Sequence, residues 1–168
     1  MDLFDAIRSR RSIRRFRPDP VPQALLEQIV DAGRLAPTAH NDQPWEFVVV
    51  TSPGTRRQIA EITDYGKFIA DAPACVVVLS RPTRHAVEDG SAATATMLLA
   101  ATGLGLGSCW VAGYTKAYAA KIAALCGAPG DLVLISMIAI GYPDESPAPS
   151  KRSLDDVLHW EVLGRKHR

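Results

Sequence analysis

Three short apolar runs constrain the fold of this chain most strongly. They are "EFVVV" at 46–50, "ACVVVLS" at 74–80 and "LVLISMIAI" at 132–140. Each is rich in β-branched residues, and the longest has about half the length that a bilayer span requires, so each predicts a buried strand. The Gly-rich segment 103–107 leads into a further strand. Strands that alternate with helical patterns predict an α/β or α+β domain, with a sheet of about four strands covered by helices.

The segments between the strands have the spacing of helices. These helices are predicted over residues 2–10, 22–36, 53 onward, 89–102 and 116–125. After the last strand the chain continues as "YPDESPAPSKRS", an irregular stretch with three prolines. A compact domain has little reason to end in such an extended arm unless the arm packs against something. The sequence therefore indicates a partner subunit.

The composition is that of one ordinary globular domain. The chain has 168 residues, of which 47% are hydrophobic and 22% charged, and its formal net charge is +1. We therefore expect a single domain over residues 1–168, and neither a membrane protein nor one that binds nucleic acid through general basic charge. The three cysteines show neither a CxxC pattern nor the His/Cys spacing of a zinc site, so we expect reduced thiols, a cytoplasmic location and no bound metal.

Five arginines crowd into "RSRRSIRRF" at 8–16. Arg10, Arg14 and the Ser12 hydroxyl are groups that together match the oxygens of one phosphate. Two other interpretations are open at this point, a solvated basic helix end and contact with nucleic acid. The nearly neutral charge of the whole chain makes nucleic acid the weakest of the three.

Two further segments contain residues suited to a planar ligand. The loop 37–44 carries Asn41 and Gln43, whose amides offer the donors and acceptors that a heterocycle needs; alternatively, they bond to the loop's own backbone. The run "GLGLG" at 103–107 permits close approach of the backbone to a flat ligand, or simply ends a helix. It follows a helix rather than a first strand, so it is not a dinucleotide-binding fingerprint. Cys109 has no evident His partner, and no protein nucleophile is predicted.

Taken together, these pieces resemble the nitroreductase family of FMN-dependent flavoproteins. The motifs that carry the resemblance span nearly the whole chain, in the order expected of a short family member: "RRSIRRF" at 10–16, "APTAHNDQPWEFVVV" at 36–50, "EDGSAATATMLLAATGLGLGSCWV" at 88–111, "IAIGYP" at 138–143 and "KRSLDDVLHWE" at 151–161. The resemblance implies an α+β homodimer in which two FMN molecules lie at the subunit interface and the C-terminal arm is exchanged between the chains.

The resemblance also implies cofactor-binding roles for particular residues. Those that resemble ligands of the FMN phosphate are Arg10 and Ser12, with Arg11 beside them. Arg14 resembles the basic residue at the ribityl chain and the N1/O2 side of the flavin. The residues that resemble ring contacts from the other subunit are Pro37, Thr38, Ala39, Asn41 and, in support, Gln43. The backbone beside the isoalloxazine is expected at Gly105, Leu106 and Gly107. The basic pair that returns to the phosphate is Lys151 and Arg152, acting together or singly.

The activity implied by the resemblance is that of an NAD(P)H oxidoreductase. Hydride passes from NADH or NADPH to flavin N5 and then to an electron-poor acceptor such as a nitroaromatic or a quinone, in a ping-pong sequence. The flavin carries the chemistry, so no catalytic side chain is expected. Similar relatives perform reductive dehalogenation, flavin fragmentation or heterocycle oxidation, and a nucleic-acid-binding module is the other alternative. Larger members carry a lid over the flavin, for which segments 63–73 and 81–89 leave little room.

Overall fold

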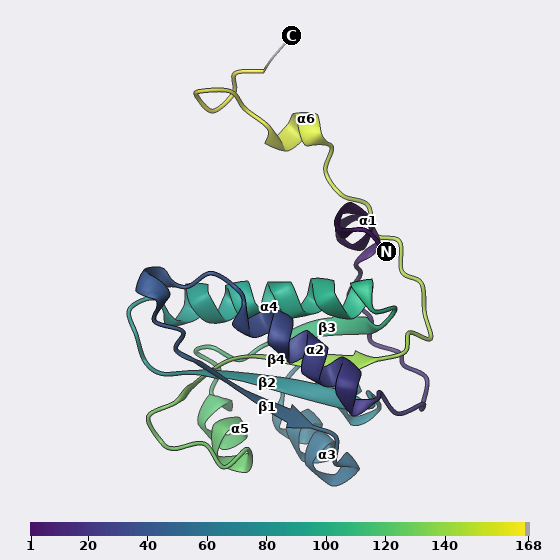
Figure 1. Cartoon of the computed structure of the whole chain (residues 1–168), viewed down its shortest axis with the longest axis vertical. Coiled ribbons are helices and arrows are strands. Elements are labelled where there is room, and N and C mark those ends of the chain that lie inside the picture. Colours follow the sequence, from purple (N-terminus) through teal and green to yellow (C-terminus); the bar gives the residue numbers. More distant parts are fainter. Residues whose placement is uncertain (167–168) are drawn as a thin grey trace.

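The computed structural model describes residues 1–166, and these form a four-stranded sheet (Figure 1). In spatial order its strands are β1 (Trp45–Val50), β2 (Ala74–Ser80), β4 (Val133–Gly141) and β3 (Gly107–Ala112). Every neighbouring pair is antiparallel. The predicted α+β fold with about four strands is thus confirmed. Because β1 and β3 form the two edges, one side of each strand has no strand partner in this sheet.

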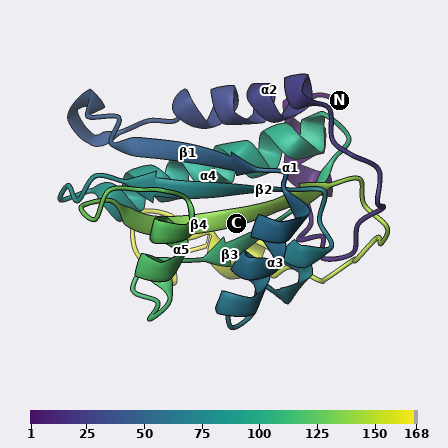
Figure 2. The ribbon, with the colours of Figure 1, turned by 90° about the horizontal axis from the view of Figure 1, so that it is seen from below.

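Helices cover both faces of the sheet. On one face lie α2 (Gln23–Arg34) and α4 (Ala86–Gly103), and on the other lie α3 (Pro53–Ile62) and α5 (Ala119–Leu125), as Figures 1 and 2 show. The sheet is therefore the middle layer of three, with apolar contacts on both sides.

The burial of β2 shows why its sequence is apolar throughout. Val76 and Val78 belong to the core under α2 and α4, whereas Cys75, Val77 and Leu79 belong to the core under α3 and α5. Successive side chains of a strand point to opposite faces, so a strand covered on both faces needs apolar residues at every position.

The packing of α2, α4 and β4 requires glycine at two contacts. A Cβ on Gly33 would lie 2.7 Å from the Met97 side chain, and a Cβ on Gly90 would lie 2.8 Å from the Ile135 side chain. Small residues therefore let α4 approach both α2 and the sheet. This long helix runs across the molecule. The loop 37–43 lies beside its first turn, and the arginine segment lies near its last turn.

Short elements complete the chain: α1 (Leu3–Ser9), the 3-10 turns η1 (Ala39–Asn41) and η2 (Lys67–Ala70), and α6 (Leu154–Val157). After β4 the chain passes α1 and continues as an arm, residues 142–166, that carries α6 away from the sheet (Figure 1). Within residues 1–166, no helix is both long and apolar enough to cross a membrane.

Large apolar side chains are exposed on α1 and on the arm. They include Leu3, Phe4, Ile7, Leu154, Val157, Val162 and Leu163. A group of this size, on two segments that lie beside each other and outside the main core, is typical of surfaces that another chain covers.

Candidate functional site

The arginine-rich segment lies as an extended strip between β3 and the start of the arm. Ser12 forms an isolated parallel bridge with Ser108 of β3, and Ile13 N–H donates to the Ser108 carbonyl at 3.0 Å. Further along, Arg17 N–H donates to the Tyr142 carbonyl at 2.9 Å. These backbone bonds fix segment 10–17 next to two other parts of the chain, so its alternate side chains have defined directions.

A pocket of about 390 Å³ lies between this segment and the arm. The residues that line it are Arg10, Arg11, Ser12 and Arg14 from the segment, and Pro147, Pro149 and Lys151 from the arm. Every charged side chain among them is cationic. Guanidinium and ammonium groups with a hydroxyl favour a bound anion, and the geometry of guanidinium suits phosphate in particular. We refer to this site as the anion pocket.

The five arginines of the motif do not play equivalent parts. Arg11 turns its guanidinium back onto the end of α1, where Nη1 donates to the carbonyls of Arg8 (2.7 Å) and Arg10 (2.8 Å). Arg15 lies outside the anion pocket, with Nε 3.5 Å from Glu145 Oε2. Arg10 and Arg14 are therefore the guanidinium groups best placed for an anion.

The C-terminal basic pair is also divided. Lys151 lines the anion pocket, whereas Arg152 Nη2 donates to the carbonyl of Asp156 at 2.9 Å and is not among the lining residues. The chain thus brings one cation of this pair, Lys151, to the arginines of the N-terminal segment.

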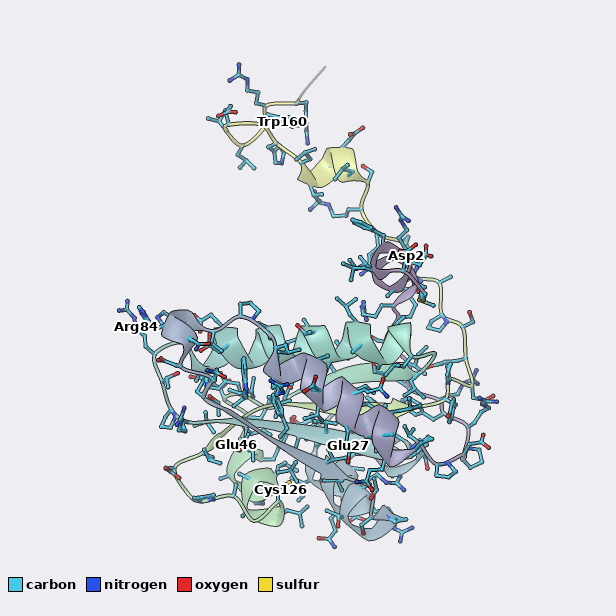
Figure 3. The ribbon with its side chains drawn as sticks, in the orientation of Figure 1. Asp2, Glu27, Glu46, Arg84, Cys126 and Trp160 are labelled. Carbon is cyan, nitrogen blue, oxygen red and sulfur yellow. The ribbon has the colours of Figure 1, made fainter. Side chains whose placement is uncertain are left out.

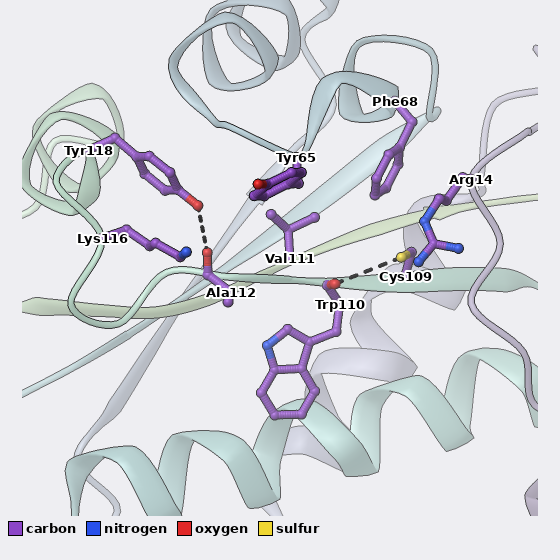
Figure 4. A pocket seen from close by; sticks show the side chains of 9 residues that line it. All are labelled: Arg14, Tyr65, Phe68, Cys109, Trp110, Val111, Ala112, Lys116 and Tyr118. Carbon is purple, nitrogen blue, oxygen red and sulfur yellow. Dashed lines mark hydrogen bonds between the residues drawn. The ribbon is translucent and has the colours of Figure 1, made fainter.

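A second pocket, of about 370 Å³, lies along β3 (Figure 4). Arg14 stands at one end and Lys116 at the other, and the aromatic rings of Tyr65, Phe68 and Tyr118 lie above the strand. The guanidinium carbon of Arg14 is 5.9 Å from the centre of the Phe68 ring. Arg14 lines both pockets, so the two adjoin at this residue. Aromatic walls beside a strand suit a flat, ring-shaped ligand. We refer to this site as the ring pocket.

The free edge of β3 supplies backbone donors beside the ring pocket. The Ser108 carbonyl accepts the Ile13 N–H, which shows that it points away from β4. Backbone groups of an antiparallel strand alternate between its two sides, so Trp110 and Ala112 also turn theirs away from β4. The Ala112 carbonyl accepts from Tyr118 Oη at 2.7 Å, in agreement with this direction. The N–H groups of Trp110 and Ala112 therefore face outward on the pocket edge.

Cys109 lines the ring pocket from β3 as a protonated thiol. Burial raises its pKa, and this effect outweighs the nearby charge of Arg14, which acts in the opposite direction. A thiol of this kind is a poor nucleophile at neutral pH. In the described part of the chain, no group of three or more His, Cys, Asp or Glu side chains is arranged to hold a metal ion.

The structure does not bring Gly105, Leu106 and Gly107 to the ring pocket. Leu106 is buried in the core, and a Cβ on Gly107 would lie 2.9 Å from the Ile13 side chain. The strand residues that line the ring pocket come later, at 109–112. Gly107 thus permits the close packing of β3 against the arginine segment, whereas Gly105, with a φ of 78°, permits the turn that leads into the strand.

Of the lining residues outside β3, four escaped the sequence analysis: Tyr65, Phe68, Lys116 and Tyr118. They lie in segments that read as ordinary turns and helix starts. These residues approach β3 only through tertiary packing, so no local sequence pattern predicts it.

The loop 37–43 lies at the opposite end of α4 from the anion pocket. Ala39 N–H donates to Oδ1 of Asp89, in the first turn of α4, at 3.0 Å. The anion pocket lies near the other end, because Ser12 pairs with Ser108 at the start of β3, shortly after the last turn of this helix. A helix of 18 residues is about 27 Å long. Figure 3 shows Arg84 beside the loop at one end and Asp2 on α1 at the other. Within one chain, the loop and the anion pocket therefore cannot contact the same small ligand.

The loop has an unusual, well-anchored backbone. Three residues have φ angles in the left-handed region, which is unfavourable for residues other than glycine: His40 (52°), Asn41 (58°) and Gln43 (45°). Arg81 Nη2 donates to the Asp42 carbonyl at 2.9 Å, which adds to the bond from Asp89. Such strain persists only where the surroundings impose it, and it is common at binding sites.

Asp89 itself has an incomplete set of partners. Its side chain is 4% exposed, and Oδ2 has no hydrogen-bond partner among the described residues. Pro37 and Asn41 are exposed, and Thr38 and Ala39 are partly buried, so the loop presents several groups to an external molecule.

Comparison with known proteins agrees with this geometry. Residues 7–65 and 63–142 match the sequence model of the nitroreductase family. A protein of Methanothermobacter thermautotrophicus, provisionally named an NADH dehydrogenase or NAD(P)H nitroreductase, is 35% identical over 167 residues, which cover 96% of this chain and 87% of that protein.

Solved structures share the whole fold. An FMN-dependent nitroreductase from Clostridium difficile R20291 superposes with a TM-score of 0.89 at 26% identity, covering 95% of this chain and 99% of that one. A provisionally named nitroreductase from Desulfovibrio desulfuricans, solved in complex with FMN, superposes with a TM-score of 0.85 at 30% identity, covering 97% and 98%. The chain described here belongs to the nitroreductase family.

Proposed function

We propose that this protein is an FMN-dependent oxidoreductase that takes reducing equivalents from NADH or NADPH and passes them to an electron-poor acceptor. The observation that carries the proposal is that Arg14 lines both a pocket whose charged side chains are all cationic and an aromatic-lined pocket along a free strand edge. The two pockets match the two ends of a flavin mononucleotide, which has one phosphate and one fused ring.

In this proposal the phosphate lies among Arg10, Ser12 and Lys151. The charged side chains that line the anion pocket are all cations, and the sequence has no dinucleotide-binding fingerprint, which favours the single phosphate of FMN over the pyrophosphate of FAD. Arg11 contributes charge nearby, although its donors are partly engaged with the end of α1. Arg152 has a lesser part, because it bonds within the arm.

The ring pocket supplies what a flavin ring needs. The outward N–H groups of Trp110 and Ala112 would offer donors to ring acceptors, and Arg14, which lines both pockets, would lie on the N1/O2 side of the ring, as the resemblance implies. A positive charge there stabilises the negative charge that the ring gains on reduction. Bound FMN supplies the hydride chemistry, and the chain's own residues bind it, orient it and exclude water. Cys109 remains protonated, in keeping with a reaction that uses no protein nucleophile.

We infer that the site is completed by a second copy of the chain. The loop residues Pro37, Thr38, Ala39, Asn41 and Gln43 lie at the far end of α4, so they would reach a flavin only in the partner. The exposed apolar side chains of α1 and the arm support the same homodimer with an exchanged arm, because a second chain would remove them from water. Residues 1–168 would form a single domain in each subunit, although 167 and 168 lie outside the described residues. The three free thiols support a cytoplasmic location.

The experiment that tests this function is anaerobic reduction of the purified holoprotein. NADH or NADPH should bleach the flavin absorbance, and a nitroaromatic or a quinone added afterwards should restore it. Steady-state rates should give the parallel double-reciprocal lines of a ping-pong sequence. A flavin that neither nucleotide reduces would overturn the proposal. A colourless protein that binds DNA in a salt-sensitive manner would favour the nucleic-acid alternative instead.

A further inference from the structure

Glu145 occupies an unexpected position for an acidic residue, because it lies beside a segment of arginines proposed to bind a phosphate. Its Oε1 accepts the backbone N–H of Arg14 at 2.5 Å and that of Arg15 at 3.1 Å. Its Oε2 lies 3.5 Å from Nε of Arg15. One carboxylate thus binds three donors from two adjacent residues.

The carboxylate does not intrude on the anion pocket. Glu145 is absent from the lining of that pocket and instead borders a neighbouring hollow of about 230 Å³, together with Gly107 and Pro143, and Arg11 and Pro147 line both spaces. It therefore contacts the arginine segment from another side. A negative charge that faced the phosphate would weaken binding, whereas one that bonds to the backbone of Arg14 and Arg15 leaves the guanidinium of Arg14 free.

Glu145 also connects the two walls of the anion pocket. One wall is the segment 10–14, and the other is the part of the arm that carries Lys151. Phe16 pairs with Pro143, and Asp144 N–H donates to the Arg15 carbonyl at 3.0 Å, so the carboxylate of Glu145 continues an existing junction. From there the chain reaches Lys151 through a stretch with two prolines, which is stiff.

Arg14 is consequently constrained at both ends. Its backbone N–H is bound by Glu145, and its guanidinium stands 5.9 Å from the Phe68 ring, a distance at which cation–π attraction operates. Donation by the Arg14 N–H is also the main reason that the pKa of Glu145 is lowered, so the carboxylate is ionised at neutral pH.

We propose that Glu145 is a positioning residue for the flavin site, which fixes the backbone of Arg14 and joins the arm that carries Lys151 to the arginine segment. This inference rests on the proposed function. It assigns to an acidic residue of the arm a role in the affinity for FMN, exerted through Arg14 and Lys151 rather than by contact with the flavin.

The test compares three variants for FMN affinity, by flavin fluorescence titration of the apoprotein. Glu145→Ala should weaken binding about tenfold or more, the effect expected when hydrogen bonds to a charged group are lost. Glu145→Gln should stay much closer to the wild type, because its amide oxygen still accepts both N–H groups. Asp144→Ala is the control, since it removes an adjacent exposed carboxylate that does not bond to Arg14. Equal losses for Glu145→Ala and Asp144→Ala, or no loss for Glu145→Ala, would overturn the proposal.

A double-mutant cycle with Arg14→Ala separates positioning from a general loss of structure. If Glu145 acts through Arg14, the fold-increase in the FMN dissociation constant of the double variant should be smaller than the product of the fold-increases of the two single variants. The midpoint potential of bound FMN should also shift in the same direction in both single variants. Losses that multiply fully, with an unchanged potential in Glu145→Ala, would contradict the proposal.

Amide hydrogen exchange of the apoprotein gives a readout that needs no flavin. The Arg14 and Arg15 amides should be protected in the wild type and in Glu145→Gln, and should exchange faster in Glu145→Ala. Unchanged protection would remove the structural basis of the inference. If the wild type failed to bind FMN while the amides behaved as expected, the proposed function would fail and the flavin role of Glu145 with it, but the contact itself would stand.

Discussion

Arg10 and Arg15 belong to one arginine motif but have different surroundings. Arg10 lines the anion pocket, whereas Arg15 lies outside it with its guanidinium beside Glu145. We expect Arg10→Ala to raise the dissociation constant for FMN about ten- to a hundredfold, because a charge-assisted hydrogen bond contributes about 1.5–3 kcal/mol. Ser12→Ala should have a smaller effect, since a neutral hydroxyl is a weaker phosphate ligand than a guanidinium. Flavin fluorescence titration of the apoprotein measures these changes.

The matched control for Arg10 is Arg15→Ala, which removes the same charge from the same segment. Its affinity for FMN should stay close to that of the wild type, with circular dichroism to confirm folding. Equal losses at the two positions would mean that the motif acts as a diffuse field, and the assignment of Arg10 to the phosphate would then be incorrect.

The carboxylate of Glu145 should make stability depend on acid pH. Its pKa is lowered in the folded chain, chiefly by the Arg14 N–H, with Arg15 also donating and both side chains positively charged. A depressed folded pKa contributes stability above the ordinary carboxyl range, and this contribution is lost as pH falls through the folded value. Urea unfolding should therefore show the wild type to be more stable than Glu145→Gln at neutral pH, with this difference shrinking as the pH falls below the ordinary carboxyl range. A difference in unfolding free energy between the wild type and Glu145→Gln that stays constant, or grows, as the pH falls would contradict this prediction.

At the scale of single residues, the sequence reveals the ligand class better than the arrangement around it. The residue types at Arg10, Ser12 and Lys151 predict an anion site, and all three line one pocket in the structure. Tyr65 and Phe68 approach β3 only through tertiary packing. Glu145 is harder still to foresee, because an acid near a phosphate site looks unfavourable until its bonds to backbone N–H groups are seen.

Among the elements, the buried strands were the easiest to predict. The runs at 46–50, 74–80 and 132–140 correspond closely to β1, β2 and β4. β2 and β4 are covered on both faces and are apolar for that reason, whereas β1 is an edge strand in which Glu46 and Val49 are exposed, so the prediction that it is buried is only partly right. The spatial order of the strands depends on contacts between distant parts of the chain, which no local pattern encodes. For the same reason, the direction of the arm could not be predicted.

The glycines around β3 provide a direct test of how this strand is placed. Gly107→Ala should destabilise the protein by about 1–3 kcal/mol, because its Cβ would lie 2.9 Å from Ile13 and something must move. Since Ile13 lies between Ser12 and Arg14, FMN affinity should fall as well. Urea unfolding and fluorescence titration measure the two effects.

Gly103, at the end of α4, is the control for Gly107. Nothing lies within 4 Å of a Cβ built there, so Gly103→Ala should leave stability unchanged or raise it by about 0.5–1 kcal/mol. If Gly107→Ala proved as harmless as Gly103→Ala, the close contact between β3 and the arginine segment would be refuted.

On the scale of the whole molecule, the decisive fact is the length of α4, which separates the loop 37–43 from the anion pocket. Asp89→Ala removes the acceptor of the Ala39 N–H at the loop end. We expect it to weaken FMN binding, although Asp89 lies in the first turn of α4 and the anion pocket of its own chain lies near the other end of this helix. Only a flavin held between two chains accounts for such an effect, which titration of the apoprotein would detect.

The control for Asp89 is its exposed neighbour in the first turn of α4, Glu88. Glu88→Ala should bind FMN as the wild type does, and Asp89→Asn, which keeps an acceptor oxygen, should lie between the two. Wild-type affinity in Asp89→Ala would argue that the loop takes no part in the flavin site.

Native mass spectrometry of the purified protein tests the central claim most directly, because it reports the assembly and its cofactor together. A homodimer with one FMN per chain is the result that the structure leads us to expect, with the flavin mass lost when the dimer is dissociated. A monomer that retains FMN, a protein that carries FAD, or a chain that takes up no flavin after reconstitution would contradict the account.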